Sequence, residues 1–340
     1  MASFKERLNE WREDYLVERS FVKHLLWFLL ALFVVLLLVG WYWSQEPEPF
    51  DVRSGISDYP KQPVGAVTAT TMIRVVDTLL EKPGGFLSND VTPPGIWLDN
   101  IPSWEYGVVI QLRDFSKAMR EAFSRPQSQS TEDADLALAE PRFNYDHAKW
   151  MFPAAETGYR EGADYVENYL KRLRDEDQYD AQFYARADNL NYWLRTVETR
   201  LGNLSQRLTA SVGQTRLNTD LAGDPAARQS TPTADEVEDK TPWLEIDNRF
   251  YEARGASWAL IHFLRAVEVD FADVLEKKNA RISLQQIIRE LEGTQQTLWS
   301  PMVLNGDGFG LMANHSLVVA SYISRANAAL IDLRALLDQG

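Results

Sequence analysis

The sequence predicts an all-α fold in which a single N-terminal transmembrane helix precedes a large extracytoplasmic helical bundle. Three observations favour it. Residues 25–43 form an uninterrupted run of 19 apolar residues. Beyond this run, apolar residues recur at spacings of three and four, which is the period of a helix. The alternation of apolar and polar residues that marks a half-buried strand is scarce in the whole chain.

The apolar run is long enough to cross a bilayer. At about 1.5 Å per residue it covers a hydrocarbon layer of about 30 Å, and it contains no charge, no proline and one glycine. A cleaved signal peptide is the competing interpretation. Such a peptide has a shorter apolar core followed by small residues, whereas this run ends in WYWSQEP. We therefore predict an uncleaved anchor over residues 25–43.

The charges beside the run predict its orientation. Residues 1–24 form a charged leader with five basic and five acidic residues. Because basic residues are retained on the cytoplasmic side, we place the leader in the cytoplasm and everything after residue 43 outside it. The residues expected at the two membrane interfaces are Lys23 and His24 on the inner side and Trp41, Tyr42 and Trp43 on the outer side.

Composition narrows the class of partner. The formal net charge of -14 falls on the part after residue 43, because the leader is balanced and the run is uncharged. An acidic body disfavours nucleic-acid binding, and repulsion from anionic lipid disfavours a body that lies flat on the bilayer. The chain has no cysteine, which excludes thiol catalysis and thiolate zinc sites.

The remaining elements follow in order along the chain. Prolines at 47, 49, 60 and 63 predict an extended spacer over residues 44–63, and the helical body then covers residues 64–340. Apolar periodicity predicts helices over 64–80, 104–123, 156–173, 183–208, 246–274 and 314–337. Polar and Pro/Gly-rich composition predicts flexible loops near residues 125–135 and 218–240.

Two of these helices carry apolar seams with alternating spacings of four and three. The seam residues are Leu190, Leu194, Val197, Leu201 and Leu204 in the first helix, and Leu260, Leu264, Val267 and Phe271 in the second. A repeat of 3.5 residues keeps one seam facing a partner helix. We expect the two seams to pack on each other within one bundle; the alternative is that one seam binds a second subunit.

No motif in the chain specifies a chemistry. The four histidines have no second histidine or glutamate at metal-ligand spacing. The stretch NGDGFG at 305–310 lacks the Lys-Ser/Thr of a phosphate-binding loop and the carboxylate series of a calcium loop, so we interpret it as a helix-terminating turn. We predict no catalytic residue, no cofactor and no metal site.

Several strings resemble a known family. They are PRFN at 141–144, AQFYARAD at 181–188, TPWLEIDN at 241–248 and QQTLWSPM at 295–302. Together with the single N-terminal anchor they resemble a proteobacterial family of inner-membrane proteins named only as domain of unknown function 2333. The resemblance implies a Gram-negative inner membrane and a periplasmic body. It implies no activity, ligand or site.

Two functions are consistent with these features. The first is a non-catalytic scaffold or assembly protein, anchored in the lipid bilayer by one helix, whose partner is another envelope protein or a second copy of itself. The second is an envelope enzyme or ligand sensor that binds sugars or peptides in a cleft between helices. The residues that could line such a cleft are Trp97, Trp104, Trp299, Asp307, Asn314 and His315.

Overall fold

The computed structural model describes residues 4–54, 56, 61–126, 131–175, 180–217, 236–300, 302–308 and 310–339, with side chains from residue 21 onward. The helices are α1 (Phe4–Trp43), α2 (Ala66–Glu81), α3 (Asn100–Ala118), α4 (Ala134–Phe143), α5 (Ala155–Arg174), α6 (Ala187–Thr209), α7 (Ile246–Asp270), α8 (Ala272–Lys277), α9 (Arg281–Gly293) and α10 (His315–Asp338). Short helical turns are η1 (Gly95–Trp97), η2 (Met119–Phe123), η3 (Ala210–Val212) and η4 (Trp243–Glu245). Strands β1 (Gln214–Leu217) and β2 (Glu236–Asp239) form an antiparallel hairpin. The predicted all-α fold is confirmed.

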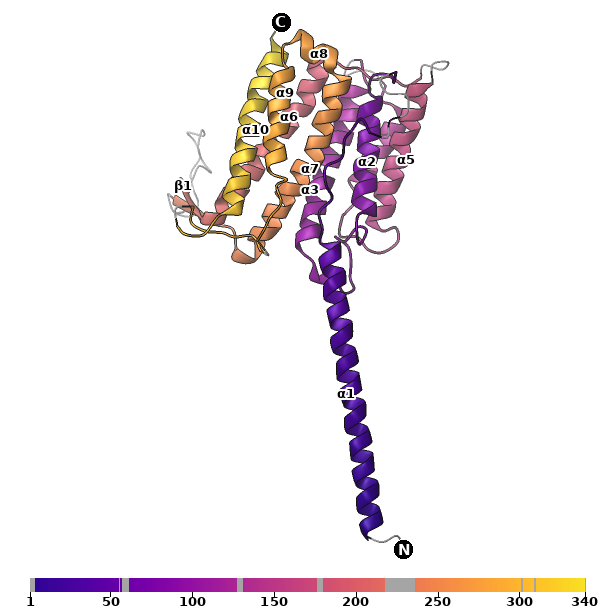
Figure 1. The fold of residues 1–340 in the computed structure, drawn as a ribbon. Helices are drawn as coiled ribbons and strands as arrows, with labels where there is room; N and C mark the ends of the chain where they lie inside the picture. The colour runs from indigo at the N-terminus through magenta and orange to yellow at the C-terminus, as the bar shows by residue number, and fades with distance from the viewer. Residues whose placement is uncertain are drawn as a thin grey trace, which may run out of the picture.

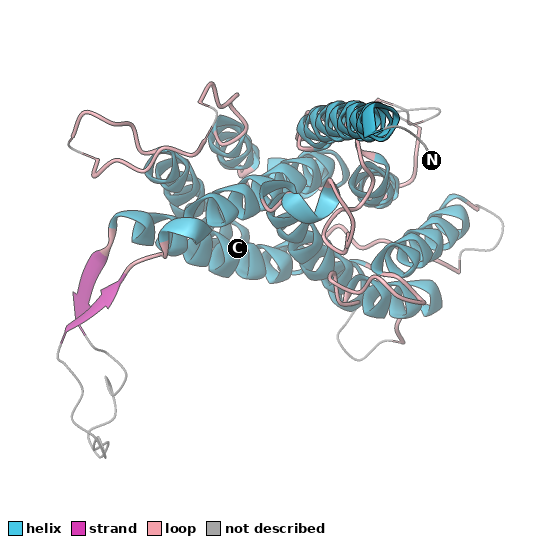
Figure 2. Ribbon diagram, turned by 90° about the horizontal axis from the view of Figure 1, so that it is seen from below, coloured by secondary structure: helices cyan, strands magenta, loops and turns pink. Residues whose placement is uncertain are grey.

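The helices of the body run up and down between two ends. Helix α1 projects from one end as a long rod, and the C-terminus lies at the opposite end (Figure 1). We call the end that carries α1 the anchor end; it is built from four connections, described over residues 82–99, 144–154, 210–217 with 236–245, and 294–300 with 302–308 and 310–314. The opposite end is the far end. Seen from below, along α1, the connections of the anchor end surround the base of the bundle (Figure 2).

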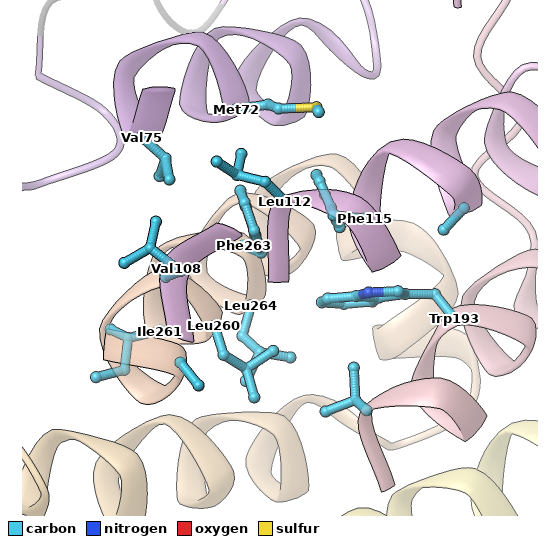
Figure 3. Packing of buried hydrophobic residues seen from close by; sticks show 14 of the residues in the cluster. Met72, Val75, Val108, Leu112, Phe115, Trp193, Leu260, Ile261, Phe263 and Leu264 are labelled. Atoms are coloured by element: carbon cyan, nitrogen blue, oxygen red, sulfur yellow. The ribbon is translucent and has the colours of Figure 1, made fainter. Parts of the chain in front are cut away.

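Helices α3 and α7 form the centre of the bundle. They approach so closely that a Cβ added to Gly107 would lie 2.1 Å from the carbonyl oxygen of Glu252, and one added to Gly255 would lie 1.9 Å from that of Trp104. Around this crossing, apolar side chains from α2, α3, α6 and α7 interlock (Figure 3). The rings of Phe115 and Phe263 stack with centroids 4.1 Å apart. The two glycines therefore set the spacing on which the core is built.

The predicted seams are buried inside the chain. All nine seam residues belong to the apolar core. Helix α6, however, packs most extensively on α10, and α7 packs most extensively on α3. Helices α6 and α7 also contact each other, so the expected packing of the two seams on each other is only part of what buries them, and each seam finds most of its partners on a third helix. The nine seam residues are buried within the chain, which leaves none of them exposed to bind a second subunit.

The structure changes several element boundaries. Helices α4 and α9 were not predicted from the sequence. The helix predicted over 246–274 ends at Asp270 and continues as the separate α8, and the helix predicted over 183–208 begins only at Ala187. Of the two predicted flexible loops, residues 127–130 and 218–235 lie outside the described residues. Beside them, Asp133 caps α4 by accepting from the amides of Asp135 and Leu136, and residues 236–239 pair in the hairpin.

Candidate anchoring site

The C-terminal part of α1 is the one segment among the described residues that is long and apolar enough to span a membrane. It covers Phe21–Trp43, and its side chains are almost all exposed. Lys23 and His24 lie exposed at its start, and Trp41 and Tyr42 are exposed near its end. Because the rest of the described chain does not cover these apolar side chains, only a surrounding apolar phase such as a bilayer can remove them from water.

The last turn of α1 is seated in the body. Trp43 is half-buried against the apolar core, and its ring lies where a side chain on Gly84 would be: a Cβ there would be 2.7 Å from the Trp43 Cγ. Gly84 has a φ of 85°, which favours glycine on its own account. Of the five predicted interface residues, Trp43 is thus a packing residue as well.

The α2–α3 connection packs along α1 below this point. A Cβ on Gly40 would lie 3.4 Å from the Pro94 side chain, so the backbones are in close contact. At the end of η1, the ring of Trp97 packs edge-on against the ring of Phe33, with centroids 6.4 Å apart. Contact between the body and α1 therefore extends well into the apolar run.

The chain that follows α1 is held on the body at several points. We call residues 46–56 the clamp. Glu46 accepts from the Arg254 guanidinium at 2.9 Å, and Arg254 is itself buried and bonded to the carbonyl of Thr294. Val52 and Ile56 are buried in a small apolar cluster beneath α2 and α7. The described part of the segment predicted as an extended spacer is thus docked on the bundle, because its apolar side chains and carbonyls find partners there; residues 55 and 57–60 lie outside the described residues.

His262 of α7 is the central polar contact of the clamp. Its Nε2 accepts a hydrogen bond from the Phe50 amide at 2.9 Å, and its Nδ1 lies 2.7 Å from the Trp258 carbonyl oxygen. Since an amide can only donate, Nε2 carries no proton, and Nδ1–H donates to the carbonyl. Burial lowers the pKa of His262 to about 3, and the nearby Arg265 and Arg74 act in the same direction. The ring is therefore neutral at physiological pH.

Phe50 is packed from both sides. Its ring stacks on His262 with centroids 3.9 Å apart, and the Arg74 guanidinium lies 4.0 Å above its centroid. Arg74 also donates to the carbonyls of Asp51 and Ser54, and Arg265 donates to the carbonyl of Phe50. These contacts hold Phe50 and the backbone that follows it against α2 and α7.

A buried ion pair holds the α2–α3 connection that touches α1. Lys82 and Glu105 meet at 2.6 Å with both side chains fully buried. Glu105 also accepts from the amides of Leu87 and Ser88 at 2.8 and 2.7 Å. Burial raises the pKa of Glu105, while Lys82 and the hydrogen bonds oppose this shift. With its oxygens occupied, this carboxylate shapes a loop and is not available for proton transfer.

The six residues predicted to line a cleft do not come together. Trp104 is buried in the core against Trp258, and Trp97 packs on α1. The other four belong to the α9–α10 connection and the start of α10. There Trp299 is exposed, Asp307 accepts from the Gly310 amide, Asn314 caps α10 through the Leu317 amide, and His315 Nδ1 accepts from the Leu304 amide. These polar residues stabilise a turn.

A polar groove that the sequence did not predict lies between the starts of α3 and α7. It encloses about 350 Å³ and is lined by Ser88, Pro102, Ser103, Tyr106, His147, Glu245, Asn248, Arg249 and Glu252. Its carboxylates are paired, Glu245 with Arg249 at 3.1 Å and Glu252 with Arg207 at 2.6 Å. Burial lowers the pKa of His147. Among the described residues, no three His, Asp or Glu side chains are grouped to hold a metal ion.

Comparison with known families covers both the anchor and the body. Residues 17–340 match the family described as uncharacterized protein conserved in bacteria, DUF2333. The chain belongs to the DUF2333 family. The DUF2333 match includes the whole apolar part of α1 as well as the clamp, so the family model covers the anchor and the bundle together. No curated protein and no solved structure gave a significant match.

Proposed function

We propose that this protein is a non-catalytic, single-pass assembly scaffold of the bacterial inner membrane, with its N-terminus in the cytoplasm and its bundle in the periplasm. The observation that carries the proposal is the clamp. An enzyme tethered to a membrane can work at the end of a flexible linker, whereas a scaffold must hold its body at a fixed position relative to the membrane. The basic leader residues and the bacterial distribution of the family support the orientation and the compartment.

The partner of the scaffold is another envelope protein or a second copy of this chain. Photo-reactive residues placed at exposed positions of the bundle, such as Ile331 on α10 and Tyr192 on α6, should capture it in living cells. We expect a discrete adduct that survives purification from membranes. A chain that stays monomeric at high concentration and yields no adduct from either position would contradict the proposal.

The orientation is tested separately. A fluorescent protein that matures only in the cytosol, fused after the C-terminus, should stay dark, and the same reporter placed before residue 1 should glow. The reverse pattern would place the bundle in the cytoplasm.

The polar groove favours one alternative function, that of a ligand sensor for a sugar or peptide. The side-chain oxygen of Asn248 is buried there without a hydrogen bond, and Tyr106 and Arg249 offer aromatic and charged surface. Titration of the purified full chain with cell-wall fragments, followed by the fluorescence of its tryptophans, would distinguish the two functions. Saturable binding that Arg249→Ala abolishes would favour the sensor.

A further inference from the structure

The exposed apolar side chains of the bundle are concentrated at the anchor end. Beyond Trp43, 14 of the 20 exposed large apolar residues that are described lie in its four connections. We call six of them, chosen to represent all four connections, the apolar rim: Ile96, Trp97, Phe152, Trp243, Trp299 and Leu311. Each connection contributes to the rim. Phe152 and Trp299 are 99% and 93% exposed, so they have no packing role within the chain.

The segments that carry these side chains are uncharged. No acidic or basic residue occurs in the five stretches in which the rim residues lie, which are 91–98, 150–154, 241–244, 298–306 and 308–314. Charged residues nevertheless border these stretches within the same connections, among them Asp90, Asp99 and Asp307. Repulsion from anionic lipid still acts on these neighbours, so contact with lipid is favoured here by the apolar side chains and their position and not by charge.

The position of the rim indicates what it contacts. All four connections lie at the end from which α1 emerges (Figures 1 and 2). Trp97 contacts Phe33, which precedes Trp43 by ten residues, or about 15 Å along the helix. If α1 spans the bilayer, as the proposed function requires, then the ring of Trp97 lies at the depth of the lipid, and the other connections of the anchor end face the same side of the bundle. The seating of Trp43 and the contacts of the clamp hold this end of the bundle next to the end of α1.

We propose that the apolar rim inserts into the outer leaflet of the membrane that α1 spans, so that the bundle is held by four shallow loop contacts in addition to its helix. Tryptophan is the side chain most suited to this depth, because its ring is apolar and its N–H can reach water or headgroups. Apolar faces of interfacial segments are buried about 5–10 Å into the boundary between headgroups and acyl chains. A protein partner would have to fit between the bundle and the bilayer.

The absence of cysteine makes the test direct. Single cysteines are introduced into the full chain as Phe152→Cys and Trp299→Cys in the rim. Val35→Cys in the exposed part of α1 is the reference for lipid, and Ile282→Cys, exposed at the far end, is the reference for water. Each is labelled with an environment-sensitive fluorophore in phosphatidylcholine nanodiscs, with and without phosphatidylcholine that carries a quenching nitroxide at carbon 5. Helicity measured by circular dichroism confirms that each variant is folded.

We expect lipid-borne quenching of about twofold at both rim positions and at residue 35, and none at residue 282, because shallow insertion places the label beside the nitroxide. Quenching at residue 35 without quenching in the rim would overturn the inference and leave the anchor intact. A blue-shifted but unquenched rim label would mean that protein, such as a second copy of the chain, covers the rim, which also overturns it. Absence of quenching at residue 35 would instead refute the proposed function.

Discussion

Replacement of His262 by glutamine should remove an acid sensitivity that the clamp gives to the folded body. Glutamine can accept from the Phe50 amide and donate to the Trp258 carbonyl, as the neutral imidazole does, but it does not titrate. Protonation of His262 would place a hydrogen on Nε2, facing the Phe50 N–H, and would leave a charge buried beside Arg265. In the folded protein, protonation of His262 is therefore incompatible with the hydrogen bond from the Phe50 amide.

The size of the effect follows from the pKa of His262 in the two states. That pKa is about 3 in the folded protein and 6.5 in the unfolded chain, so between these values the unfolded chain binds one more proton. The stabilisation is fully present above pH 6.5 and is lost as the pH falls toward 3. At about 1.4 kcal/mol per pH unit the total is about 5 kcal/mol, and at pH 5 the loss is already about 2 kcal/mol.

The assay is chemical denaturation of the full chain in detergent at pH 7.5 and pH 5, followed by circular dichroism. Other groups, including Glu105, contribute to the pH dependence of both proteins, so the informative quantity is the difference between wild type and His262→Gln. We expect wild type to lose about 2 kcal/mol more than the variant over this interval. Equal losses would refute the assignment of a neutral, buried imidazole.

Three further changes test the packing and the buried charges by the same denaturation. Gly255→Ala should destabilise the folded protein by about 2 kcal/mol, because its Cβ would meet a backbone carbonyl of α3. As the control, Gly202→Ala should stabilise the fold by up to about 1 kcal/mol, because the nearest neighbour of its Cβ would be 3.7 Å away. Equal effects of the two substitutions would argue against the close crossing of α3 and α7. Lys82→Met should cost about 3–5 kcal/mol by leaving Glu105 uncompensated, and the cost should shrink as the pH falls and Glu105 becomes protonated; a cost independent of pH would contradict a charged pair. Leu264→Ala should cost about 2–5 kcal/mol without altering the oligomeric state in size-exclusion chromatography, and a change of state would reopen the subunit interpretation of the seam.

The parts of the fold that the sequence predicts are those with a strong local period. The apolar run of α1 and the seams of α6 and α7 are visible as uninterrupted patterns, and both are placed correctly as an apolar rod and as core. Helix α9 carried a usable signal as well, because Leu284, Ile287, Ile288 and Leu291 are its buried residues and have helical spacing. Its short length of 13 residues made the pattern easy to overlook.

The anchoring site could not be predicted in the same way. Phe50 and His262 are 212 residues apart, and nothing near either residue indicates the other. The prolines at 47 and 49 are compatible with an extended chain in solvent and with an extended chain docked in a groove, so composition does not separate the two. The rim is missed for a related reason: an apolar residue in a loop is equally consistent with burial, and only the structure shows that Trp299 has nothing to pack against.

The last turn of α1 is seated at the anchor end, so the length of the helices sets how far the far end lies from it. Helix α10 runs from the anchor end to the far end, and its 24 residues correspond to about 36 Å. In the proposed function, a surface near the C-terminus is therefore presented at about this height above the bilayer, and a molecule that extends from the lipid by less than this distance does not reach it. Insertion of one helical turn in α10 alone would not raise that height, because α6, α9 and the other helices would have to lengthen with it.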